Sequence, residues 1–174
     1  MLTAARTPVG WYRRLNIDRQ VLLANAATYG TILVLAALEA VTPSDVRSGH
    51  GLELVAGVGV ATWLAHTFAE VVGLQLRRPN AFSWPDLWFA AATSGPIILA
   101  TLGPALLLAL GRFEVLPADV ALWLAVVLGV LQLVVLGVVV GSSHGASRAR
   151  VWAFVGGTVA IGAIVVLLKV ALSH

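Results

Sequence analysis

The chain has 174 residues, of which 59% are hydrophobic and 11% charged, with a formal net charge of +3 and a mean hydropathy of +0.93. Soluble domains carry about 25% charged residues, so this chain has too few charges to cover a water-facing surface. The composition predicts an all-α polytopic membrane protein. Its lack of cysteine excludes disulfides and thiolate metal sites. Its arginines stand at the ends of apolar runs rather than in a patch, so we expect no nucleic-acid partner.

Residues 1–20 carry four arginines and form the predicted cytoplasmic N-terminal segment. The apolar run that follows is longer than the roughly 7–15 residues of a signal peptide, so we predict an uncleaved first span. A spanning helix needs about 20 mostly apolar residues. Five segments meet this requirement, at 21–41, 52–74, 87–110, 120–141 and 151–172. Short, turn-rich connections join them, which predicts one five-helix transmembrane domain over residues 21–172.

Lysine and arginine are divided unequally between the two predicted sides. The side of the N-terminus holds eight of them: Arg6, Arg13, Arg14, Arg19, Arg77, Arg78, Arg148 and Arg150. The other side holds three: Arg47, Arg112 and Lys169. Cytoplasmic loops are enriched in these residues, which predicts a cytoplasmic N-terminus and an outside C-terminus in a bacterial cytoplasmic membrane. Tryptophans favour membrane interfaces, and we place Trp84 and Trp88 at the inner one and Trp123 at the outer one.

The stretch WLAHTFAEVVG, residues 63–73, places two ionisable side chains inside the second span. His66 and Glu70 are four residues apart, so they share one helix face. At about 1.5 Å per residue from Arg77, Glu70 lies roughly 10 Å and His66 about 16 Å from the inner boundary. Ionisable groups in hydrocarbon cost several kcal/mol unless they are paired, and they usually mark an ion or proton path. Their nitrogen and oxygen atoms suit a divalent first-row metal or a proton.

The first span carries a matching polar pair, Asn25 and Tyr29, also four residues apart. Measured from Arg19, Asn25 lies about 9 Å and Tyr29 about 15 Å deep, so they are level with Glu70 and His66. Helices joined by a short loop usually pack together, which predicts a polar ladder between these two spans. Other polar residues at similar or mid-membrane depth are Thr93, Ser94, Gln132 and Thr158.

The third predicted span contains two Gly-Pro pairs, ending at Pro96 and Pro104. Proline removes a backbone donor and clashes with the preceding turn, so we expect a kinked helix. Backbone freed in this way is tolerated in a membrane only against protein or a water-filled cavity. One interpretation is a helix that lines a cavity or gates a pathway. The other is an inert kink, because proline is frequent in spanning helices.

The order of these features resembles the vacuolar iron transporter family. The matching stretches are NAATYGT (25–31), AHTFAE (65–70) followed by LRRP (76–79), and PDLWFAAATSG (85–95). The resemblance implies five spans, a cytoplasmic N-terminus and metal transport, with Glu70 on the family's glutamate and His66 on its methionine. The chain departs from the family in lacking its first-span aspartate, its thioether ligands and its acidic cytoplasmic region. The WLAH-x-x-AE pattern also resembles small actinobacterial membrane proteins.

Two functions fit this sequence. The first is a divalent-metal or proton-linked cation transporter that uses Glu70 and His66, assembled as a homo-oligomer, with a dimer favoured. The second is a non-transporting scaffold or partner subunit, in which the polar side chains join helices and Glu70 pairs with Arg77 or Arg78. An enzyme is not expected, because GSSHG (141–145) lacks a strand–turn–helix context and a base. The sequence identifies no certain cofactor, and a divalent metal ion is considered as a substrate.

Overall fold

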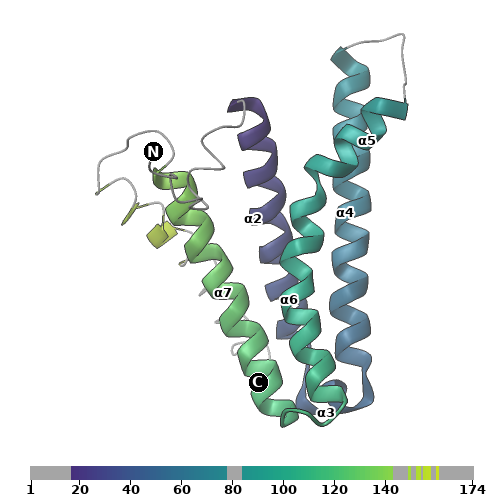
Figure 1. The fold of residues 1–174 in the computed structure, drawn as a ribbon, viewed down its shortest axis with the longest axis vertical. Helices are drawn as coiled ribbons and strands as arrows, with labels where there is room; N and C mark the ends of the chain where they lie inside the picture. Colours follow the sequence, from purple (N-terminus) through teal and green to yellow (C-terminus); the bar gives the residue numbers. More distant parts are fainter. Residues whose placement is uncertain are drawn as a thin grey trace, which may run out of the picture.

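A computed structural model describes residues 17–77 and 84–142, together with positions 149, 152, 153, 155–157 and 160. The elements of the described ranges 17–77 and 84–142 are all helices (Figure 1). In chain order they are α2 (Ile17–Glu39), α3 (Pro43–Ser48), α4 (His50–Arg77), α5 (Trp84–Thr93), α6 (Gly95–Arg112) and α7 (Ala118–Ser142).

Four of these helices are long and apolar enough to cross a membrane, over Arg19–Glu39, His50–Leu76, Gly95–Arg112 and Ala118–Gly141. Large apolar side chains such as Leu64, Phe68, Leu99 and Leu106 are more than half exposed on their surfaces. A water-soluble monomer rarely exposes so much contiguous apolar surface, whereas a bilayer covers it. The described part of the chain is therefore all-α, and its four long apolar helices indicate a membrane protein. The predicted spans 21–41, 52–74 and 120–141 correspond to α2, α4 and α7.

The fifth predicted span, 151–172, falls almost wholly outside the described residues. So do the loop that contains GSSHG and most of the arginines used to assign the orientation. The four-helix arrangement is therefore established, and the fifth span remains a prediction.

Helices α2 and α6 form the centre of the bundle, with α4 on one side and α7 on the other (Figure 1). The four long helices converge at the end that carries α3, and α7 tilts away from the others toward the opposite end. The apolar core lies near the convergent end. It is built from Val34, Leu35, Leu38, Val41, Val46, Val55, Leu108, Ala121, Ala125 and Leu133.

Small residues allow the central helices to approach closely. A Cβ atom on Gly30 of α2 would lie 2.8 Å from the Cα of Ile97 in α6, and one on Gly129 of α7 would lie 2.6 Å from a methyl group of Leu35. Gly59 of α4 likewise faces the side chain of Thr101 in α6. Backbone proximity of this kind is the usual way in which membrane helices gain packing energy.

The short helix α3 was predicted from the sequence only as a turn. A capping box starts it: the backbone N–H of Asp45 donates to the Thr42 hydroxyl, and the Asp45 carboxylate accepts from the Thr42 backbone at 2.8 Å. The hydrogen bonds from Thr42 lower the pKa of Asp45 from its ordinary value. Gly49 ends α3 with a φ of 89°, and the Arg112 guanidinium donates to the Ser48 carbonyl, which joins α6 to α3.

The third predicted span differs from the continuous helix expected over 87–110. It is divided at Ser94 into the ten-residue α5 and the eighteen-residue α6. Pro96 stands in the first turn of α6, where its missing N–H costs least, so the chain breaks before it. Pro104 is buried inside α6 without interrupting the helix. At the first of the two expected kinks, near Pro96, the helix breaks completely. At the second, Pro104, the helix continues without a break.

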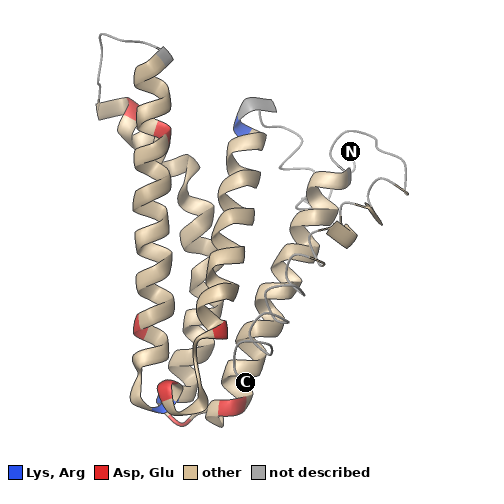
Figure 2. Cartoon of the chain, turned by 180° about the vertical axis from the view of Figure 1, so that it is seen from behind, with Lys and Arg blue, Asp and Glu red and all other residues tan. Residues whose placement is uncertain are grey.

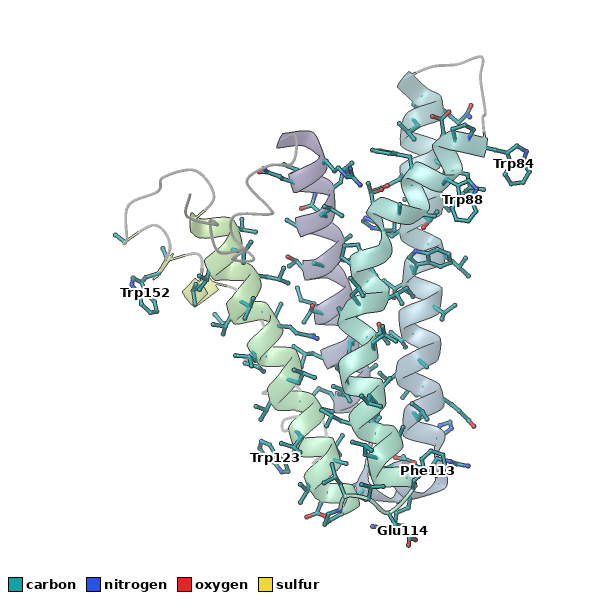
Figure 3. The ribbon with its side chains drawn as sticks, in the orientation of Figure 1. Trp84, Trp88, Phe113, Glu114, Trp123 and Trp152 are labelled. Atoms are coloured by element: carbon teal, nitrogen blue, oxygen red, sulfur yellow. The ribbon has the colours of Figure 1, made fainter. Side chains whose placement is uncertain are left out.

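Charged residues and tryptophans mark the two ends of the bundle. The charged residues gather mainly at the α3 end and, more sparsely, at the other end, with uncharged helix between them (Figure 2). Trp84 and Trp88 extend from the end at which α5 begins, and Trp123 lies toward the α3 end (Figure 3). All three are more than 70% exposed. They therefore lie at opposite ends of the bundle, and their assignment to the inner and outer membrane interfaces stays a prediction.

Candidate functional site

His66 and Glu70 occupy successive turns of α4 and point along one face of it. The distance from His66 Nε2 to Glu70 Oε1 is 3.6 Å, and the side chains are only 22% and 12% exposed. A second His/Glu pair on the same helix, His50 and Glu53, is 68% and 79% exposed, with 4.0 Å between the nearest atoms. Burial therefore distinguishes the predicted pair from an ordinary surface pair.

Helix α5 supplies a donor to the Glu70 carboxylate. The Thr93 hydroxyl donates to Glu70 Oε2 at 2.6 Å, and it also lies 2.8 Å from the carbonyl of Phe89 and 3.0 Å from that of Ala90. The indole N–H of Trp63 donates to the Ala91 carbonyl at 3.1 Å. Two hydrogen bonds therefore fix the last turn of α5 against α4: one is donated by Trp63 of α4, and the other is accepted by Glu70 of α4.

Helix α2 contributes one half of the predicted ladder. The rings of Tyr29 and His66 are stacked, with centroids 6.2 Å apart and an angle of 28° between their planes. Asn25 is exposed, and no hydrogen bond links its side chain to another described residue. Glu70 turns toward Thr93 of α5, so Asn25 has no carboxylate to meet. The Tyr29–His66 pair of the predicted ladder is confirmed. The second pair, Asn25 with Glu70, is not formed in this structure.

The remaining polar residues divide into two places. Ser94 is fully buried at the α5–α6 break, next to Thr93, and its hydroxyl lacks a hydrogen-bond partner within the described structure. Gln132 instead lines a groove of about 400 Å³ between α2, α6 and α7, together with Thr31 and Pro96. Thr158 lies outside the described residues. The single polar layer expected from depth alone is therefore not one site, because Gln132 lies across the bundle from Glu70.

A small cavity opens beside the Glu70 carboxylate. It has a volume of about 180 Å³ and lies between α2, α4 and α5. Its described lining is Leu22, Glu70, Gly73, Leu74 and Phe89. Glu70 is thus the one charged side chain of an otherwise apolar wall among these residues.

The two oxygens of Glu70 differ in their surroundings. Oε2 accepts from Thr93, whereas Oε1 is buried without a hydrogen-bond partner among the described groups and has His66 Nε2 as its nearest ionisable neighbour. A buried acceptor left without a partner costs about 1–3 kcal/mol, and more when it is charged. A proton or a cation at Oε1 would remove this cost. The alternative partners considered from the sequence, Arg77 and Arg78, have no described side chains.

The described residues contain no group of three or more His, Cys, Asp or Glu side chains that could hold a metal ion. His66 and Glu70 alone supply two ligands, fewer than the four to six or more that zinc, magnesium or calcium require.

Sequence reasoning missed two contributors to this site, Trp63 and Phe89, and the role of a third, Thr93. Thr93 was selected for its depth, but its bond to Glu70 depends on the position of α5, which breaks away from α6 at Ser94. Trp63 is the one tryptophan deep in a predicted span, but nothing in the sequence predicts its hydrogen bond to the Ala91 carbonyl. Phe89 is one more apolar residue of an apolar helix, and nothing in the sequence sets it apart.

Comparison of the chain with protein-family models, with curated proteins and with solved structures finds no match in any of the three. The resemblance to the vacuolar iron transporter family therefore rests on the quoted sequence stretches alone. Functional conclusions follow from the geometry around Glu70.

Proposed function

We propose that this protein is a proton-linked cation carrier of the bacterial cytoplasmic membrane, with Glu70 as the carboxylate that binds the proton or the cation in turn. The observation that carries the proposal is the Glu70 carboxylate, which belongs to the wall of a cavity and whose Oε1 atom is buried with no hydrogen-bond partner among the described groups. Ionisable groups inside spanning helices are costly and are usually functional. His66 and Glu70 are two such groups on one helix face, and Glu70 lines a cavity, which supports a role in ion movement.

The chemistry assigned to the pair is exchange at one carboxylate. A protonated Glu70 is neutral and compatible with the apolar wall. When its proton passes to His66 Nε2 or to water, the carboxylate becomes the binding site for a cation. Thr93 keeps Oε2 in place in both states, so the exchange occurs at Oε1. His66 is the relay, and its ring is held by the stacked ring of Tyr29.

The α5–α6 break is the proposed moving part. Helix α5 carries Thr93 and Phe89, both of which bear on the Glu70 site, and it joins α6 through the single non-helical residue Ser94. Broken helices next to midplane sites are the usual gating elements of secondary transporters. A shift of α5 about Ser94 would open or close the cavity without displacing the central α2–α6 contact.

Metal transport is the weaker form of this proposal. The family resemblance suggests a divalent metal as substrate, but the described donor set has only two ionisable ligands and no thioether. We therefore favour the proton-linked form. The proposal includes a homodimer with a cytoplasmic N-terminus, since a chain of this size is small to enclose a pathway alone.

A non-transporting scaffold is the second candidate, and one observation favours it. The bonds from Trp63 to Ala91 and from Thr93 to Glu70 hold α5 against α4 in the manner of ordinary helix contacts. If that were their whole purpose, Glu70→Gln and His66→Ala would lower thermal stability or dissociate oligomers, with no dependence on ions.

Proton flux into proteoliposomes separates the two candidates. We expect an imposed gradient to drive flux in the wild type, loss of at least about tenfold in Glu70→Gln, and retention in Glu53→Gln, the exposed glutamate of the same helix. Equal reconstitution and equal melting temperatures are the controls. Flux that survives Glu70→Gln at the wild-type rate would refute the carrier function.

A further inference from the structure

Among its described lining residues, the cavity beside Glu70 combines one carboxylate with apolar and aromatic side chains, and this combination identifies a class of ligand. We propose that it binds a small organic ammonium ion, an alkylamine or arylamine in its protonated form. The inference rests on the proposed function for its link to proton movement. Binding itself depends only on the cavity.

The charged end of such a ligand meets the Glu70 carboxylate, which lines the cavity. Its Oε1 atom has no hydrogen-bond partner among the described groups, and the side chain is only 12% exposed. Oε2 is already occupied by the Thr93 hydroxyl at 2.6 Å. A carboxylate has about four lone-pair positions, so the bond from Thr93 leaves acceptor capacity for an N⁺–H donor. A charge-assisted hydrogen bond of this kind is about twice as strong as a neutral one.

The uncharged end of the ligand meets the rest of the wall. Leu22, Leu74 and Phe89 line the cavity together with Gly73, and its volume is about 180 Å³. Apolar side chains and an aromatic ring suit alkyl or aryl groups, and a ring can also attract the cation itself. A Cβ atom on Gly73 would have no neighbour within 4 Å, so this glycine leaves space that the ligand can fill.

A bare metal ion does not match these walls. Divalent cations need several oxygen or nitrogen ligands, and the described part of the lining offers one carboxylate, with His66 Nε2 nearby. An organic ammonium pairs its single charge with the single carboxylate, and its carbon atoms gain from leaving water. The same reasoning disfavours a neutral ligand, which would leave the carboxylate without a counter-charge.

Binding of radiolabelled benzylamine to the purified full chain in detergent tests this proposal. We expect saturable binding that weakens at least about tenfold in Glu70→Gln, through loss of the charged acceptor. Gly73→Leu fills the cavity and should weaken binding by a similar factor. Gly57→Leu is its matched control, because Gly57 lies on the same helix with equally open surroundings. Benzyl alcohol should not compete.

Three results would overturn the inference. One is the absence of saturable benzylamine binding by folded protein, and another is binding that persists in both Glu70→Gln and Gly73→Leu. The third is Glu70-dependent binding of Mn²⁺ that benzylamine does not displace. The flux assay keeps this inference separate from the carrier function: Glu70-dependent proton flux without benzylamine binding contradicts only the ligand class. Glu70-dependent benzylamine binding without any flux contradicts only the carrier function.

Discussion

At the scale of single residues, Glu70 depends on a donor that lies on another helix. The Thr93 hydroxyl satisfies Oε2, and it does so from the last residue of α5. The i, i+4 spacing was enough to predict that His66 and Glu70 share a face. It was not enough to predict that Glu70 bonds with Thr93 of α5 rather than with Asn25 of α2, because the partner depends on how the helices are placed in space.

Replacing Thr93 by valine should remove this donor with almost no change of shape. We expect the free energy of unfolding to fall by about 1–3 kcal/mol, because Oε2 then loses its donor in a side chain that is only 12% exposed. Unfolding of the purified protein by titration with a denaturing detergent measures the change. Thr67→Val is the control: the Thr67 hydroxyl is buried without a hydrogen-bond partner in the described structure, so its removal should be neutral or stabilising. Equal stability of Thr93→Val and wild type would show that Thr93 does not support Glu70.

At the scale of elements, hydropathy alone located α2, α4 and α7 to within a few residues, because length and apolarity decide membrane insertion. It failed at the third span and at α3. The break at Ser94 depends on where Pro96 falls relative to a helix start, and Pro104, an equally strong signal, leaves α6 intact. Helix α3 is a short capped helix of six residues. A loop of this length could have almost the same sequence.

The contact between α2 and α6 should be the one least tolerant of added volume. Gly30→Ala places a methyl group 2.8 Å from the Cα of Ile97, and backbone cannot move aside as a side chain can. We expect a loss of about 1–3 kcal/mol in unfolding free energy. Gly57→Ala faces open space on α4 and should be neutral or stabilising, by up to about 1 kcal/mol from helix propensity. If Gly30→Ala were as stable as Gly57→Ala, the close approach of α2 and α6 would be contradicted.

At the scale of the whole molecule, the two ends of the bundle are chemically distinct. Trp84 and Trp88 mark one end, and α3 with Trp123 marks the other (Figure 3). The membrane class and these two ends could be predicted from composition and tryptophan placement. The tilt of α7 and the separation of Gln132 from Glu70 could not, because helix packing is decided by contacts between distant residues.

Orientation can be measured directly, since the chain has no cysteine of its own. Ser44→Cys in α3 and Trp84→Cys at the start of α5 introduce single thiols at exposed positions on opposite ends. The predicted cytoplasmic N-terminus requires that a membrane-impermeant maleimide label Ser44→Cys in intact cells and Trp84→Cys only after lysis. The reverse pattern would invert the orientation, and labelling of both in intact cells would contradict the spanning arrangement.

The central claim is that His66 and Glu70 act as one unit in moving protons. Proton flux through reconstituted wild type, His66→Ala, Glu70→Gln and the double variant tests it most directly. If the residues form one relay, the double variant loses no more flux than Glu70→Gln alone. His66 has no remaining role in proton movement once Glu70 is replaced. Losses that multiply in the double variant, or wild-type flux in Glu70→Gln, would contradict the account.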